Sequence, residues 1–123
     1  MEFEQPKGIY QQIADQISDR IVLGEWQAGE RIPSIRELAV SMGVNPNTVT
    51  RSYQSLLDDG VIENRRGIGY FVAEDATVRI VSQRKQAFLR EELPRLFHTM
   101  RLLGIDSEEI ASHLAALEKE HQS

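Results

Sequence analysis

The chain has no cysteine among its 123 residues, so no disulfide framework can hold it together. A reducing cytoplasm is therefore permitted, and we expect a cytoplasmic protein. Its N-terminus, MEFEQPKGIY, has neither the basic start nor the apolar core of a signal peptide. No apolar run approaches the length of a membrane span, so we expect no membrane contact.

Residues that carry catalysis or hold metals are also scarce. The three histidines, His98, His113 and His121, are scattered, and no Ser–His–Asp or Cys–His arrangement is suggested. Glu109 and His113 stand four residues apart and could hold a metal, but two ligands rarely make a site without others. The glycines of residues 67–69 are too few for a phosphate-binding fingerprint. We therefore expect no enzyme, no metal site and no cofactor.

Residues 34–43 predict a short helix with a signal at each end. Ser34 followed three residues later by Glu37 is a capping box, in which each residue bonds the backbone N–H of the other. Gly43 is the residue type that ends a helix in the left-handed conformation without steric cost. Apolar residues recur at helical spacing between these signals and predict the buried face: Ile35, Leu38, Ala39 and Met42.

A second helix is predicted to begin at once and to end at Gly60. Asn45 is a good N-cap, and Pro46 stands at the first helical position, where its missing N–H costs nothing. A turn this short holds the second helix away from the domain body, where it can enter a major groove. The predicted inner face is Val49, Tyr53, Leu56 and Leu57. The polar side chains near its start can read base edges or bond phosphates: Asn47, Thr48, Thr50 and Arg51.

A β-hairpin is predicted after the second helix. Residues 61–64 and 70–72 are β-prone, and residues 65–69, RRGIG, are expected to form the turn between them. Its glycines permit the positive φ that a hairpin turn needs. Arg65 and Arg66 at the tip suit a phosphate or a narrow minor groove. Residues 31–32 could add a third strand, and the order of parts predicts a winged helix-turn-helix.

Three segments together resemble the GntR family of bacterial transcription regulators: GERIPSIRELA (29–39), GVNPNTV (43–49) and GIGYFV (67–72). The NPNTV helix start and the short helical tail resemble the YtrA subfamily. The resemblance implies a homodimeric repressor that binds a palindromic operator, often beside transporter genes. Many members carry arginine where this chain has Pro46 and Thr50, so the usual base-reading arginine is not transferred. The matching positions are Arg36, Arg51 and the wing, whose common Thr is Tyr70 here, expected in a strand.

An earlier helix is predicted from about residue 7 to residue 23. Its apolar stripe repeats every four residues: Ile9, Ile13, Ile17 and Ile21. Lys7 and Tyr10 could touch a DNA backbone, although packing is the favoured interpretation of Tyr10. Trp26, the only tryptophan, is expected in the core.

The tail predicts helices whose apolar stripes need a partner. A helix from about residue 77 to 103 contains Pro94, which predicts a kink or break, and it ends at Gly104. Asp106 and Glu109 predict the capped start of a final short helix. Because a chain this small cannot bury these stripes alone, a second copy in a two-fold dimer is expected. The alternative is a tail folded back on a monomer.

These patterns predict an α+β, mainly α fold. Residues 1–75 are expected to form a winged helix-turn-helix of three helices and a small antiparallel wing, and residues 76–123 a two-helix dimerisation region. The net charge of −5 weakens the attraction to DNA, so the placement of the arginines has to compensate for the sum.

We therefore expect a sequence-specific DNA-binding regulator. Its predicted DNA contacts are Arg36, Asn47, Thr48, Thr50, Arg51, Arg65, Arg66 and Gly67. One alternative is a winged helix that docks on proteins through the exposed helix face. Another is a switch in which an unknown small effector or a metal acts through the tail helices, although nothing in the sequence defines such a pocket.

Overall fold

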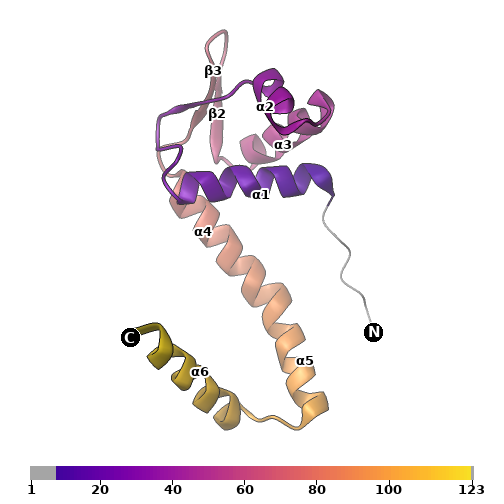
Figure 1. Ribbon diagram of the computed structural model, residues 1–123, viewed down its shortest axis with the longest axis vertical. Coiled ribbons are helices and arrows are strands. Elements are labelled where there is room, and N and C mark those ends of the chain that lie inside the picture. Colours follow the sequence, from indigo (N-terminus) through magenta and orange to yellow (C-terminus); the bar gives the residue numbers. More distant parts are fainter. Residues whose placement is uncertain (1–7, 123) are drawn as a thin grey trace. The chain divides into compact units, whose positions relative to one another are not determined.

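The computed structural model describes residues 8–122, which are mainly helical (Figure 1). The chain divides between Gln83 and Arg84 into two compact units. None of the described helices is long and apolar enough to cross a membrane. The elements, in chain order, are α1 (Ile9–Val22), β1 (Arg31–Ile32), α2 (Ile35–Met42), α3 (Pro46–Asp58), β2 (Ile62–Arg65), β3 (Gly69–Val72), α4 (Ala76–Ala87), the π-helical segment η1 (Phe88–Glu92), α5 (Leu93–Leu103) and α6 (Ser107–Gln122).

The core of the N-terminal unit lies where α1 packs against α3 (Figure 1). The predicted stripe of α1 enters this core through its last three isoleucines, whereas Ile9 is exposed. Trp26 is buried, as predicted, and Gly24 takes a φ of 83° just past the end of α1. The predicted start near Lys7 lies outside the described residues, and the described helix begins at Ile9.

The wing is a three-stranded antiparallel sheet with the strand order β1-β3-β2. Arg31 pairs with Phe71 across β1 and β3, so the predicted third strand is confirmed. One face of the sheet belongs to the core because Ile32, Ile62 and Val72 are all buried. A third strand stabilises a hairpin that would be marginal alone.

The turn of the wing is shorter than the sequence predicted. Arg65 is the last residue of β2 and pairs with Gly69, so it does not lie in the turn. The Ile68 N–H donates to the Arg65 carbonyl at 2.9 Å and closes a turn of residues 66–68, with Gly67 at a φ of 78°. The prediction that both arginines stand at the tip was therefore wrong for Arg65, because the strand pairing extends one residue further than the β-prone run.

Helix α4 begins inside the N-terminal core. Its residues Ala76 and Ile80 are buried with the core side chains of the wing and of α1. The packing of the N-terminal unit thus continues to Gln83, past the end of the wing. The functional division at residue 75 stays a prediction.

The predicted interruption at Pro94 takes the form of a π-helical turn. The Leu93 N–H donates to the carbonyl of Phe88, five residues earlier, and Pro94 follows in the first turn of α5. A proline without an N–H is tolerated in a first turn, so the chain remains helical and does not break. Gly104 ends α5 with a φ of 69°, as predicted.

Helix α6 begins at the predicted cap and runs further than predicted. The Glu109 N–H donates to an Asp106 carboxylate oxygen at 2.9 Å. The whole helix, Ser107–Gln122, has 16 residues, so the expectation of a short final helix was wrong. No described residue between 84 and 122 is buried. The most exposed apolar side chains of α5 and α6 are Phe97, Leu102, Leu103, Leu114 and Leu117.

Candidate nucleic-acid interface

The start of α2 is fixed by the predicted capping box. The Glu37 N–H donates to the Ser34 hydroxyl at 3.1 Å, and the Ser34 N–H donates to a Glu37 carboxylate oxygen at 3.3 Å. These bonds to Ser34 hold the pKa of the Glu37 carboxyl below its ordinary value. Gly43 ends the helix in the left-handed conformation, with a φ of 68°. Both ends of α2 therefore lie where the sequence places them.

The start of α3 is fixed in the same way. The Asn45 side chain accepts a hydrogen bond of 2.8 Å from the Asn47 N–H, and Pro46 occupies the first turn. The turn between α2 and α3 is thus closed by its own residues. This geometry presents the first turns of α3 as a separate face, which is the arrangement that a helix needs in order to enter a major groove.

The inner face of α3 is held by buried polar contacts as well as by apolar packing. Val49, Tyr53 and Leu56 are buried as predicted. The Tyr53 hydroxyl donates to the Pro33 carbonyl, and the Tyr53 and Tyr70 rings meet in a T-shaped arrangement with their centroids 4.9 Å apart. Burial raises the pKa of the Tyr53 hydroxyl. Tyr53 thereby ties α3 to the segment before α2 and to the wing.

Ser52 is a buried contact that the sequence did not reveal. Its hydroxyl lies 2.7 Å from the Tyr10 carbonyl and 3.1 Å from the Thr48 carbonyl. Its side chain is fully buried, at 0% exposure. A serine among polar neighbours gives no sign of this role, because the contact depends on where α1 passes α3.

The outer face of α3 carries the predicted polar residues, which differ in the hydrogen-bond donors and acceptors that they can still offer to DNA. Asn47 and Thr50 are exposed, and Thr48 is half-buried. The Thr50 hydroxyl donates to the Pro46 carbonyl at 3.0 Å, so it can offer DNA only an acceptor and its methyl group. Within residues 8–122 the Asn47 side chain forms no hydrogen bond, so its amide keeps donors and an acceptor for a base edge.

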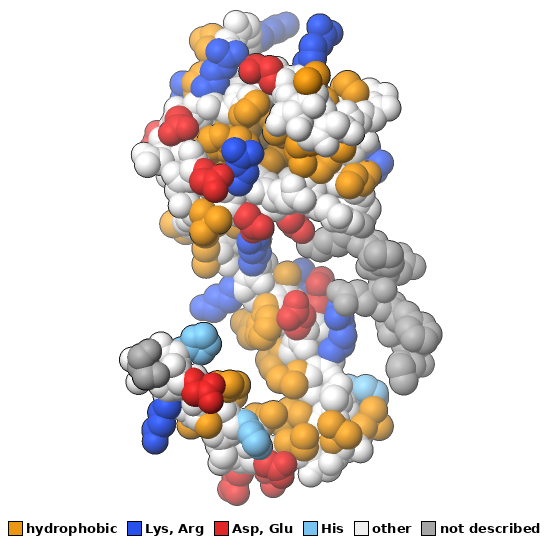
Figure 2. Space-filling view, in the orientation of Figure 1, with side chains coloured by type: hydrophobic (Ala, Val, Ile, Leu, Met, Phe, Trp, Pro, Cys, Tyr) orange, Lys and Arg blue, Asp and Glu red, His pale blue; other side chains and the backbone are white. Residues whose placement is uncertain are grey.

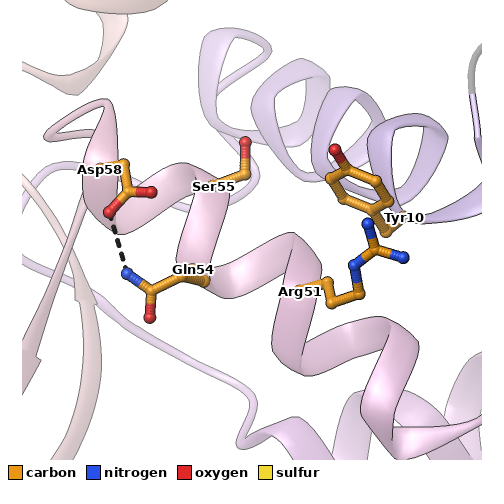
Figure 3. A pocket seen from close by; sticks show the side chains of 5 residues that line it. All are labelled: Tyr10, Arg51, Gln54, Ser55 and Asp58. Atoms are coloured by element: carbon orange, nitrogen blue, oxygen red, sulfur yellow. Dashed lines mark hydrogen bonds between the residues drawn. The ribbon is translucent and has the colours of Figure 1, made fainter.

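Arg51 is exposed and lies against α1. Its guanidinium carbon is 4.1 Å from the centroid of the Tyr10 ring, so Tyr10 has the packing role that the sequence favoured (Figure 3). Both residues line a shallow open pocket between α1 and α3. Gln54 and Asp58 line it too, and the Gln54 amide donates to the Asp58 carboxylate at 2.9 Å.

The predicted arginines outside α3 occupy two different kinds of position. Arg65 lies over the Phe71 ring, 4.0 Å from its centroid, with one guanidinium nitrogen 4.0 Å from a Glu63 oxygen. Arg36 on α2 and Arg66 in the wing turn are exposed, and neither has a partner in the part of the chain that the structure describes. Lys and Arg side chains are visible at the end of the N-terminal unit that carries the wing tip (Figure 2).

Arg31 joins the basic residues of the wing, and sequence analysis did not select it. Arg31 and Glu63 both pair with Phe71, which places all three side chains on the outer face of the sheet. The guanidinium of Arg31 lies so close to Gly69 that a Cβ there would come within 2.9 Å of its Nε. The predicted strand at residues 31–32 could have indicated this position, because successive side chains of a strand point to opposite faces and Ile32 is buried.

The described residues contain no group of three or more His, Cys, Asp or Glu side chains that could hold a metal ion. The pair Glu109 and His113 thus stands without a third ligand among them. The polar groups that gather on α3 and the wing are mostly arginine, threonine and amide side chains. With the exception of Thr50, such groups can donate to phosphates and base edges.

Comparison with known proteins places this geometry in a family. The family described as bacterial regulatory proteins, gntR family, matches residues 9–72. The chain is 43% identical over 109 residues to YhcF of Bacillus subtilis, an uncharacterized HTH-type transcriptional regulator, covering 89% of this chain and 88% of YhcF. It is 34% identical over 102 residues to the HTH-type transcriptional repressor YtrA of the same organism, covering 83% of this chain and 78% of YtrA.

Solved structures of transcription regulators also superpose on this chain. A GntR-family transcriptional regulator from Bacteroides thetaiotaomicron superposes with a TM-score of 0.84 at 46% identity, covering 93% of this chain and 99% of that chain. The DNA-binding domain of AraR, crystallised with operator ORR3, superposes with a TM-score of 0.50 at 29% identity, covering 59% of this chain and 95% of that chain. The resemblance that the sequence indicated is confirmed, and the chain belongs to the GntR family as a YtrA-like, winged helix-turn-helix, DNA-binding transcription regulator, not an enzyme.

Proposed function

We propose that this regulator is a repressor that binds an inverted-repeat operator as a homodimer. The observation that carries the proposal is the outer face of α3. Its polar side chains follow directly after the Asn45 cap, and the inner face of the same helix is buried in the core. A helix presented in this way reads the major groove, and dimers of such modules read two half-sites. The repressor role is proposed by analogy with YtrA, a transcriptional repressor that is identical to this chain at 34% of the aligned residues.

The proposed DNA contacts divide by chemistry. Asn47 and Arg51 read base edges, because an amide and a guanidinium can each make paired hydrogen bonds to one base. Arg36 and Thr48 contact phosphates or bases at the sides of the groove, whereas Thr50, as an acceptor, contacts a donor group on a base edge. The wing residues bind the backbone or the minor groove: Arg65, Arg66 and Gly67.

The unit from residue 84 to 122 is proposed as the dimer interface. Phe97 is 59% exposed and Leu103 is 67% exposed, although both belong to apolar stripes. Two helices of this size cannot bury such stripes by themselves. A second copy related by a two-fold axis covers equal stripes on both chains and accounts for a palindromic operator.

Selection from random double-stranded DNA at moderate salt, followed by sequencing, tests this proposal. We expect enrichment of an inverted repeat whose half-sites lie about one helical turn apart or a little more. In transcription with purified components, the repeat placed over a promoter should lower transcript yield when the protein is added. Failure to enrich any sequence, with a dimer established by light scattering, would refute sequence-specific binding by the protein alone.

A further inference from the structure

Arg51 depends on one side chain for its position. Arginine has many rotamers, so an exposed guanidinium loses conformational entropy when it is fixed on a base edge. In the described residues Arg51 forms no ion pair, and the Asp58 carboxylate, two turns further along α3, accepts from Gln54. The contact that does hold the guanidinium is the Tyr10 ring, with 4.1 Å between the guanidinium carbon and the ring centroid (Figure 3).

Tyr10 is itself fixed by the residue after Arg51. The buried Ser52 hydroxyl lies 2.7 Å from the Tyr10 carbonyl, so two successive residues of α3 contact the same residue of α1. The first turn of α1 is also closed locally, because the Gly8 N–H donates to the Gln11 side chain at 2.9 Å. The position of the ring relative to α3 is therefore set by the packing of α1 on α3.

We propose that Tyr10 is a positioning residue that sets the sequence preference of this regulator by holding the Arg51 guanidinium ready for one base pair. The inference rests on the proposed base-reading role of Arg51. A cation over an aromatic ring is held through the face of the guanidinium, and the N–H donors in its plane stay available for hydrogen bonds. Fixing the side chain before binding also reduces the entropy lost when the contact forms.

The test compares Tyr10→Phe with Tyr10→Leu on the selected operator and on its single base-pair variants. Arg51→Ala first identifies the base pair that Arg51 reads. At that base pair, Tyr10→Leu should lower the preference for the operator base by about two- to fivefold, the factor expected for an exposed cation–π contact. Tyr10→Phe keeps the ring and should keep the preference. Neither variant should change the dependence of binding on salt.

A double-mutant cycle separates positioning from a structural effect. In an Arg51→Ala background, Tyr10→Leu should cause no further change of preference, because the side chain to be positioned is absent. Thermal melts check that the variants fold. If Tyr10→Leu does not fold, Tyr10→Gln is a second non-aromatic replacement for this half-buried position. An equal loss of affinity at every base pair would show a structural role and would overturn the inference.

Three further outcomes would also overturn it, and the first two distinguish it from the base-reading role of Arg51. If Arg51→Ala relaxes one base pair while Tyr10→Leu and Tyr10→Gln leave that base pair unchanged, the base-reading role stands and the positioning role fails. If Arg51→Ala relaxes no base pair, both fail. A uniform loss of affinity in Tyr10→Phe would show that the Tyr10 hydroxyl binds the DNA backbone. Tyr10 would then act through its hydroxyl and not through the contact of its ring with Arg51.

Discussion

The hydroxyl of Tyr53 donates a hydrogen bond to the backbone carbonyl of Pro33. Tyr53 lies in the middle of α3 and is 1% exposed, whereas Pro33 precedes the capped start of α2. This bond therefore joins the two helices of the helix-turn-helix at a point away from their turn. The direction in which α3 points its outer face depends on both connections.

Replacing Tyr53 with phenylalanine should lower the free energy of unfolding by about 1 kcal/mol, because the Pro33 carbonyl loses its partner. Urea denaturation at a fixed protein concentration measures the change. Tyr70→Phe is the matched control, since the Tyr70 ring packs against Tyr53 but its hydroxyl forms no hydrogen bond within the described residues. Equal effects of the two variants would contradict the assignment.

The same tyrosine predicts a loss of stability in alkali. Burial raises the pKa of the Tyr53 hydroxyl, so the folded protein keeps the hydroxyl protonated where the unfolded chain ionises. Its contribution is complete below the ordinary tyrosine pKa of about 10 and is lost as the pH rises above that value. Thermal midpoints measured across this range should fall more steeply for the wild type than for Tyr53→Phe. Parallel curves would exclude Tyr53 as the group responsible.

Ser34→Ala should cost roughly 1 kcal/mol of stability through the loss of the cap of α2. Ser41→Ala is the control, because Ser41 is exposed in the same helix and has no hydrogen-bonding partner among residues 8–122. The bonds to Ser34 lower the pKa of the Glu37 carboxyl, so their contribution is present above its ordinary pKa and is lost as the pH falls through the folded value. The difference between the two variants should therefore shrink in acid, and a thermal melt in which Ser34→Ala is neutral would refute the capping box.

The parts of the fold that the sequence predicted well are governed by local chemistry. Ser34 and Glu37 cap each other within one helical turn, and Gly43 and Gly104 take the left-handed conformation where each helix ends. These signals involve residues a few positions apart, so they can be recognised without knowledge of the tertiary structure. The candidate DNA contacts on α3 follow from the same local signals, because the cap at Asn45 fixes which side chains begin the helix.

The parts that the sequence missed depend on strand register, helix packing and helix geometry that the residue pattern does not specify. The strand position of Arg65 follows from its pairing with Gly69, and two registers of the same turn sequence are equally compatible with the glycines. The position of Arg51 on the Tyr10 ring requires α1 to cross α3 at a particular point. The π-helical turn before Pro94 was missed because a proline in a helical pattern predicts a disturbance without specifying its form.

Leu96→Lys in α5 should convert the protein into a monomer if residues 84–122 form the dimer interface. In the single chain Leu96 is 44% exposed, and it lies on the same helical face as Leu93 and Met100. In the proposed dimer a lysine at this position would bury a charge without a partner. His98→Lys places the same charge on the opposite face of α5, where His98 is exposed, and serves as the control. Light scattering at several concentrations measures the mass, and a dimeric Leu96→Lys variant would locate the interface elsewhere.

Arg51 and Arg66 should respond differently to replacement with alanine if Arg51 contacts a base and Arg66 contacts the DNA backbone. Loss of a paired hydrogen-bond contact to guanine by Arg51→Ala should cost about 1–3 kcal/mol of binding and relax specificity at one position of the operator. Loss of a phosphate contact by Arg66→Ala should weaken binding to all sequences almost equally and reduce the salt slope by about 1.

The two measurements are informative together because each variant is the control for the other. Both side chains are exposed arginines of the N-terminal unit, so each replacement removes the same charge from the same unit. A general weakening of the electrostatic attraction would affect both variants alike, and only a base contact can make the loss depend on sequence. If Arg51→Ala instead lowers affinity uniformly with a shallower salt slope, Arg51 is a phosphate contact. Base reading would then be assigned first to Asn47, whose amide keeps its hydrogen-bonding groups available on the first turn of α3.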